Sequence, residues 1–220
     1  MLKSDFFYDL PDELIAQTPI EPRNHSKILV VDRKTGSLKD DYFYNLKNYL
    51  KPGDVLVLND SRVLPARLLG VSLKTKAPEE FLLLKQIEQK VWEVLTKPGK
   101  RAKVGAIFKF NDELEAEVLE VKEDGNRIVR FLCENSNIFE VFERVGRTPL
   151  PPYIKAELKD PERYQTVYSK ELGSSAAPTA GLHFTKEQLN ELADMGVEIE
   201  YITLHVGLGT FRPVKEENIE

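Results

Sequence analysis

The chain has 220 residues, of which 41% are hydrophobic and 30% charged, a composition that indicates a folded globular protein rather than a disordered one. Its formal net charge of −5 excludes a global basic field, so any nucleic-acid site would have to be a local patch. The single cysteine, Cys133, excludes an internal disulfide, and no apolar run is long enough to span a bilayer. We therefore expect a cytoplasmic protein that does not bind membranes.

The first part of the chain combines apolar runs with helical patterns. Residues 11–17 and 43–50 predict helices, and residues 27–32 and 54–58 predict buried strands. The second strand leads directly into the polar segment Asn59–Arg62. Polar residues at the end of a buried strand often contact ligands in α/β proteins. An Asx turn bonded to its own backbone would also explain this segment.

Between Arg67 and Cys133 short strand patterns replace the helical ones. Leu114, Ala116 and Val118 alternate with glutamates, as expected for a half-buried strand, and turn residues separate most runs. Trp92 is predicted to be a core anchor. The six candidate strands span residues 67–73, 80–86, 91–96, 105–110, 114–121 and 127–133. This spacing predicts a small β-barrel or sandwich.

A basic turn lies inside this β-rich region, over residues 96–103. It carries four cations, Lys97, Lys100, Arg101 and Lys103. Such a cluster at a hairpin tip could hold the phosphate backbone of a nucleic acid. The alternative is an ordinary solvated surface turn.

After the β-rich region the helical patterns return. Asn137 caps a predicted helix over residues 137–145, a short helix is expected at 160–164, and a longer one over 186–195 precedes a strand at 197–204. We therefore expect an α/β fold. It consists of a mixed α/β body domain, residues 1–63 and 148–220, with a small β-barrel domain, residues 64–147, inserted into it.

Two loops of the body stand out because they combine small residues with a histidine. Gly173–Thr185 contains His183 and ends at a helix N-cap, and Leu204–Pro213 contains His205. Loops of this kind let a ligand approach the backbone closely, although the first could equally be a tightly packed turn. We favour these two histidines over His25 as functional groups. No His, Cys and acid cluster has metal-site spacing, so no metal is expected.

Four motifs in this order resemble the bacterial S-adenosylmethionine:tRNA ribosyltransferase-isomerases of queuosine biosynthesis. They are LNDSRVLPARL (58–68), DPERYQTVYS (160–169), GSSAAPTAGLHFT (173–185) and LHVGLGTFRPV (204–214). Ser175 stands where the family usually has valine, and Lys27 stands where it usually has arginine. The family continues beyond the last motif, so we expect this chain to lack the C-terminal part of the family.

The resemblance implies a reaction. The ribosyl part of S-adenosylmethionine is moved to the aminomethyl group of 7-aminomethyl-7-deazaguanine at the tRNA wobble position and is rearranged to the epoxycyclopentanediol of epoxyqueuosine, while adenine and methionine leave. S-adenosylmethionine is thus a substrate, and no cofactor is expected. The sulfonium acidifies the adjacent C5′ hydrogen, so the reaction needs a general base, and a proton donor would help adenine to depart.

The same resemblance suggests roles for the polar segments. The predicted catalytic residues are His183, His205 and Asp60. The predicted substrate-binding residues are Asn59, Ser61, Arg62, Ser174, Ser175, Thr179, Gly181, Thr185, Gly207, Gly209, Thr210 and Arg212. The predicted tRNA contacts are Lys97, Lys100, Arg101 and Lys103. We expect a monomer. Two alternatives remain open: an enzyme acting on small molecules, and a non-catalytic RNA-binding fragment.

Overall fold

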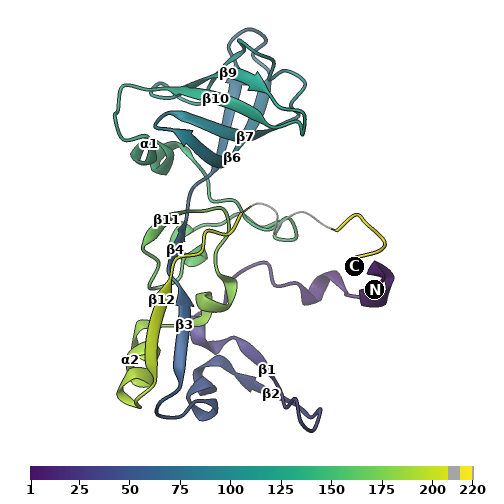
Figure 1. Cartoon of the computed structure of the whole chain (residues 1–220), viewed down its shortest axis with the longest axis vertical. Helices are drawn as coiled ribbons and strands as arrows, with labels where there is room; N and C mark the ends of the chain where they lie inside the picture. Colours follow the sequence, from purple (N-terminus) through teal and green to yellow (C-terminus); the bar gives the residue numbers. More distant parts are fainter. Residues whose placement is uncertain (208–213, 220) are drawn as a thin grey trace. The chain divides into compact units, whose positions relative to one another are not determined.

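The computed structural model describes residues 1–207 and 214–219, which fold as two compact units (Figure 1). Unit 1 comprises Met1–Arg62 and Pro151–Glu220, and unit 2 comprises Val63–Leu150. The expected class is confirmed: a mixed α/β body occurs together with a small closed β-barrel. Within the described ranges no helix is both long and apolar enough to cross a membrane.

In its described residues, unit 1 contains short 3-10 helices, one α-helix and paired strands. Its first half holds η1 (Lys3–Phe6), η2 (Asp12–Leu14), η3 (Arg23–His25), β1 (Lys27–Val31), β2 (Leu38–Tyr42), η4 (Phe43–Tyr49), β3 (Val55–Asn59) and the start of β4 (Ser61–Val63). Its second half holds η5 (Pro161–Tyr164), β11 (Glu171–Ser174), η6 (Thr179–His183), α2 (Lys186–Asp194) and β12 (Glu198–Ile202). The strands form three pairs, β1–β2, β4–β11 and β3–β12.

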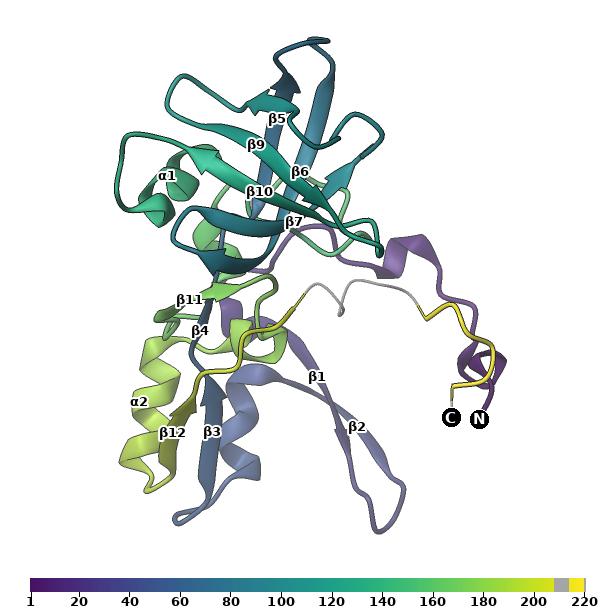
Figure 2. The same cartoon turned by 45° about the horizontal axis from the view of Figure 1, so that its top comes forward.

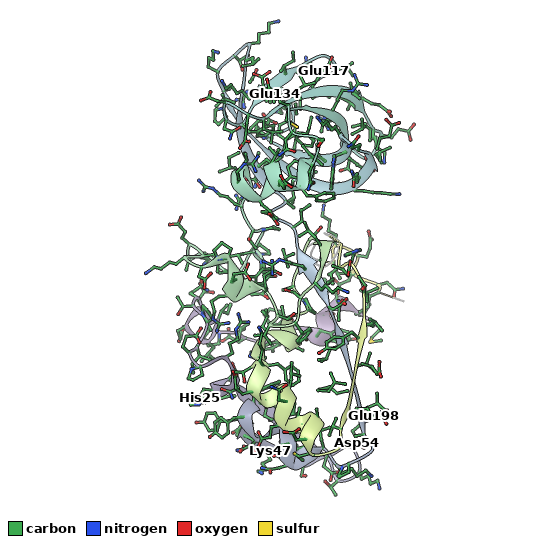
Figure 3. All side chains as sticks on the ribbon, turned by 90° about the vertical axis from the view of Figure 1, so that its left-hand side faces the viewer. His25, Lys47, Asp54, Glu117, Glu134 and Glu198 are labelled. Carbon is green, nitrogen blue, oxygen red and sulfur yellow. The ribbon has the colours of Figure 1, made fainter. Side chains whose placement is uncertain are left out.

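Strands β3 and β12 are parallel and in register, so that both end at the same edge. Val55 lies opposite Glu198, and Asn59 lies opposite Ile202. At the start of the pair, Asp54 and Glu198 lie side by side (Figure 3), and the Glu198 N–H donates to the Asp54 carbonyl. Because parallel strands share their direction, the segments that follow Asn59 and Ile202 leave the sheet together.

Helix α2 closes the core of unit 1 against β3 and β12 (Figure 1). Leu189 and Leu192 of the helix are buried in a cluster with Phe43, Leu58 and Phe184. Thr185 caps α2 as predicted, since its side chain accepts a hydrogen bond from the Gln188 N–H at 3.1 Å. The Gln188 side chain forms no capping box with Thr185. It donates to the carbonyl of Phe43 instead and so ties α2 to η4.

Unit 2 is a six-stranded antiparallel barrel, closed in the order β10-β7-β6-β5-β8-β9 (Figure 2). The strands are β5 (Arg67–Ser72), β6 (Pro78–Glu88), β7 (Val91–Lys97), β8 (Ile107–Lys109), β9 (Glu115–Val121) and β10 (Arg127–Leu132). The predicted alternation is confirmed, because Leu114, Ala116 and Val118 are fully buried. Closure also resolves the choice left open by the sequence, in favour of a barrel over a sandwich.

Helix α1 (Ile138–Val145) packs on the barrel through its apolar side. Ile138, Val141 and Phe142 are buried, and Asn137 caps the helix by accepting from the Phe139 N–H. The ring of Trp92 lies 5.4 Å from that of Phe142 and is almost completely buried. The core role predicted for Trp92 is therefore confirmed.

Several predicted elements of unit 1 differ in the structure. The helix expected over residues 11–17 is a single 3-10 turn, Asp12–Leu14, and those expected at 43–50 and 160–164 are also 3-10 helices. The strands at 27–32 and 54–58 are present but are not buried on both faces. Leu29 is 60% exposed and Val57 is 55% exposed, because each strand belongs to a two-stranded sheet whose second face is open in the described chain.

Candidate functional site

The candidate site lies where β3 and β12 end, and we call it the strand-end junction. It consists of Asn59–Arg62, the stretch from Ser169 to Ser175, and Thr203–Gly207, all within unit 1. Asn59 joins the first and last of these segments. Its side-chain amide donates to the Leu204 carbonyl at 2.9 Å, and its side-chain oxygen accepts from the backbone N–H groups of Leu204 and Ser61, both at 3.1 Å.

Asp60 connects all three segments of the junction. The hydroxyl of Thr203 donates to its carboxylate at 2.7 Å. The Asp60 carbonyl accepts from the N–H groups of Lys170 and Glu171, at 2.7 and 3.3 Å. The Thr203 hydrogen bond thus holds the Asp60 carboxylate in one orientation as an acceptor. A carboxylate that accepts a proton or orients an imidazole must be held in this way.

Ser61 and Arg62 occupy very different environments. Ser61 is fully buried, and its hydroxyl has no hydrogen-bond partner among the described residues. The guanidinium of Arg62 forms a two-pronged ion pair with the exposed carboxylate of Glu162, and it also donates to the Ser169 hydroxyl at 3.0 Å. Arg62 therefore already presents the geometry that binds a carboxylate, with Glu162 as its present partner.

The alanine-rich loop contributes its first residues to the junction. Ser174 is fully buried, its hydroxyl donates to the Ala176 carbonyl at 2.8 Å, and it accepts from the Val206 N–H at 2.9 Å. The Ser175 N–H donates to the Val206 carbonyl at 2.8 Å. These bonds seat the segment after β12 beside the end of β11, which pairs with β4.

His205 lies directly against Gly173. A methyl group built on this glycine would come within 3.0 Å of the imidazole Cε1 and within 3.3 Å of both ring nitrogens. The glycine also has a φ of +145°, a conformation that side-chain-bearing residues rarely adopt. The imidazole is exposed, so its nitrogens can reach a ligand at the junction.

His183 lies in a different setting, at the end of η6. Its ring is 5.3 Å from the ring of Phe43 and forms a hydrogen bond with the Arg23 backbone. Burial, assisted by the positive charge of Arg163, lowers its pKa below the ordinary 6.5, and the Arg23 bond opposes this only in part. In the part of the chain that the structure describes, no hydrogen bond or ring contact joins His183 to Asp60 or His205.

A titration of His183 tests this environment. Its folded-state pKa lies below the unfolded value, so the stability that the neutral ring contributes is fully present above about pH 6.5 and declines as the pH falls toward the lowered pKa. We expect the ring carbon protons of His183 to titrate below pH 6.5 in an NMR experiment, with His183→Gln assigning the signal. A midpoint at or above 6.5 would contradict the buried position.

The remaining predicted residues have local roles or lie outside the described residues. Gly181 is buried against Tyr168, whose hydroxyl would lie 2.1 Å from a methyl group built on the glycine, and Thr185 caps α2. Burial, with the nearby Tyr201, raises the pKa of Tyr168 to about 12. Thr179 and Gly207 are exposed. Gly209, Thr210 and Arg212 lie outside the described residues.

The sequence does not single out two residues that bond to predicted site residues, Thr203 and Glu162. The sequence places Thr203 inside the strand predicted over residues 197–204, although polar residues near a strand end, such as Asn59, are also candidates for a site. Glu162 lies in the DPERY motif but has no assigned role, and only its contact with Arg62, 100 positions away in the chain, shows its importance. Among the described residues, no group of three or more His, Cys, Asp or Glu could hold a metal ion.

Comparison with known proteins assigns a family to this chain. The family model described as "Queuosine biosynthesis protein" matches residues 3–220. A protein of Acetivibrio thermocellus named S-adenosylmethionine:tRNA ribosyltransferase-isomerase is 60% identical over all of this chain, and one of that name from Caldanaerobacter subterraneus is 56% identical. The chain spans 64% of the length of each of these relatives.

A crystal structure of an S-adenosylmethionine tRNA ribosyltransferase from Thermotoga maritima is 35% identical, with a TM-score of 0.38, and the match covers 93% of this chain and 59% of that one. The family match extends over both units and includes all three segments of the strand-end junction. The chain belongs to the queuosine biosynthesis protein family.

Proposed function

We propose that this chain carries the S-adenosylmethionine site, and part of the tRNA site, of a ribosyltransferase-isomerase. The enzyme would transfer the ribosyl moiety of S-adenosylmethionine to 7-aminomethyl-7-deazaguanine at the tRNA wobble position and isomerise it, giving epoxyqueuosine-tRNA, adenine and methionine. The family match and the names of the relatives support this reaction. One structural observation carries the proposal: side-chain hydrogen bonds of Asn59, Asp60 and Ser174 draw three separate segments into one junction.

The reaction needs groups that accept and donate protons. His205 suits either task, because its imidazole is exposed at the junction and an imidazole has nitrogens that can accept or donate a proton. Asp60 suits the role of acceptor for the amine's proton, since Thr203 already fixes its carboxylate. His183 remains a candidate base rather than an acid. Its lowered pKa keeps it neutral at pH 7, so it can accept a proton but has no extra proton to give.

Arg62 suits the carboxylate of the methionine part of the substrate. An arginine fork binds a carboxylate through two parallel hydrogen bonds, and Glu162 occupies this fork in the structure. Substrate binding would then require Glu162 to move away, which its exposed position permits. Arg212 is proposed for the same carboxylate or for a phosphate.

The adenosine part would lie along the small-residue segments of the junction. Ser61 has the best support among these contacts, because its buried hydroxyl lacks a partner within the described chain. A buried polar group without a partner costs free energy unless a ligand or water satisfies it. The other proposed contacts are Asn59, Ser174, Ser175, Thr179, Gly181, Thr185, Gly207, Gly209 and Thr210. We place the enzyme in the cytoplasm as a monomer.

Labelled S-adenosylmethionine tests the proposal directly. The chain is incubated with it, with and without tRNA that bears the modified wobble base, and free adenine and label on RNA are measured. The proposed reaction requires adenine release together with transfer of label, both dependent on tRNA. Turnover without RNA would indicate a small-molecule enzyme, and tRNA binding without adenine release would indicate an RNA-binding fragment.

A further inference from the structure

One end of the barrel in unit 2 carries more cations than the basic turn alone. Lys97 ends β7, and Lys100, Arg101 and Lys103 lie on the β7–β8 connection, while Lys74 and Lys76 lie on the neighbouring β5–β6 turn. All six side chains are exposed. We call these six residues the cationic barrel end.

The two turns are held next to one another by hydrogen bonds. Arg101 donates to the carbonyl of Pro78, which follows the β5–β6 turn, at 3.3 Å. On the other side of that turn, the Leu73 N–H donates to the Ile107 carbonyl at 3.0 Å, just after the basic turn ends. The β5–β6 turn is therefore attached at both of its ends to the segment that carries the other four cations.

A buried polar frame fixes the shape of the basic turn. The side chain of Glu79 is fully buried, and it accepts a hydrogen bond from the Gly99 N–H at 2.6 Å. From β10, Arg127 donates to the carbonyls of Gly99 and Ala102, both at 2.8 Å. Gly99 has a φ of +73°, and a methyl group there would come within 3.0 Å of the Thr96 carbonyl. The turn is thus preorganised, and its cations project from a rigid base.

The surrounding acids do not neutralise these cations. Glu79 lies 3.6 Å from Arg101, but it is buried beneath the turn. The adjacent β9–β10 turn carries Glu123 and Asp124, and Asp124 accepts hydrogen bonds from Asn126. Throughout residues 1–207 and 214–219, none of the five lysines of the cationic barrel end has a carboxylate within ion-pair distance.

We infer that the cationic barrel end is a binding site for the phosphate backbone of RNA, to which Lys74 and Lys76 contribute as well as the basic turn. The inference rests on the proposed function, which makes tRNA the substrate. In a protein with a net charge of −5, a local cluster of exposed cations, five of them lysines without a carboxylate partner among the described residues, is the feature that favours a polyanion. The side chains present are lysines and one arginine, which donate hydrogen bonds to phosphate oxygens and attract them by charge.

The salt dependence of tRNA binding tests the site. We expect the double variant Lys74→Gln, Lys76→Gln to bind a fluorescent tRNA transcript about tenfold or more weakly near 0.1 M salt. Its plot of log affinity against log salt should lose about 1 to 2 units of slope, because each lost phosphate contact removes about one released counterion. The matched control is Lys34→Gln, Lys51→Gln, which removes two exposed lysines from unit 1 and should leave the slope unchanged.

An unchanged slope in the Lys74, Lys76 double variant would overturn the inference. So would equal slope losses in both double variants, since they would indicate an effect of net charge alone. Binding to anionic phospholipid vesicles but not to tRNA would replace RNA by a membrane surface and would also overturn it. Adenine release separates this site from the proposed reaction: a chain that shows the expected slopes without adenine release contradicts the reaction only, and a chain that releases adenine with unchanged slopes contradicts this site only.

Discussion

Replacing His205 by alanine is expected to lower the rate of adenine release by about 10²- to 10⁴-fold, the usual contribution of a general acid or base. His205 is the exposed imidazole at the strand-end junction, where it lies against Gly173 and follows Thr203, the residue that bonds to the Asp60 carboxylate. The measurement is adenine release from labelled S-adenosylmethionine in the presence of tRNA. Binding of S-adenosylmethionine should change far less, because the variant keeps the other junction contacts.

His25→Ala is the matched control for this substitution. His25 is also an exposed histidine of unit 1, but it belongs to η3 and packs on Tyr44 at the outer surface (Figure 3). It should retain nearly normal turnover. Gly173→Ala should in turn reduce turnover, since its new methyl group would displace the imidazole. If His205→Ala and His25→Ala have the same small effect, the acid–base role proposed for His205 is wrong.

The barrel was predictable because its signals are local. Alternating residues such as Leu114, Ala116 and Val118 define each strand over a few positions, and turn residues mark the ends. The order of the strands was not predictable in the same way. Strand β10 returns to pair with β7, and β8 joins β5 to β9. These pairings depend on contacts between distant parts of the chain, which a local pattern does not encode.

Burial in unit 1 was less predictable than the strands themselves. Apolar runs such as Leu29–Val31 indicate a strand, but they do not state how many neighbours the strand has. The structure pairs β1 with β2 alone, and Leu29 is consequently exposed. A continuous apolar run is typical of strands that are buried on both faces. The expectation of burial holds only where the strand belongs to a larger sheet whose two faces are packed against other elements.

The candidate site shows the same division between local and distant information. Polar residues at strand ends identified Asn59, Asp60 and His205, and the structure joins their segments through hydrogen bonds. The sequence alone did not indicate that the two parts of the alanine-rich loop Gly173–Thr185 have different environments. Its first residues reach the junction, whereas η6 carries His183 to Phe43 and Arg23. The composition predicts a loop of small residues, but it does not predict the path of the backbone within that loop.

Replacing Phe142 by alanine is expected to destabilise the barrel by about 3 to 5 kcal/mol, the usual cost of deleting a buried aromatic ring. Phe142 is fully buried where α1 meets the barrel, and its ring packs edge-on against Trp92 and Phe131 at 5.4 and 5.0 Å. The deletion removes those aromatic contacts and leaves a cavity that the closed barrel cannot readily collapse. A loss of this size is a large fraction of the stability of an ordinary domain.

Trp92 makes this measurement specific to unit 2, because it is the only tryptophan in the chain and lies beside Phe142. Its fluorescence during denaturant unfolding reports the barrel without a tryptophan signal from unit 1. The control is Phe7→Ala, which removes the same ring from a position that is 84% exposed and should change the free energy of unfolding by no more than about 0.5 kcal/mol. Equal unfolding midpoints for Phe142→Ala and Phe7→Ala would show that α1 does not contribute to the core of the barrel. A midpoint lowered only in Phe142→Ala would establish that the helix and the barrel share one core.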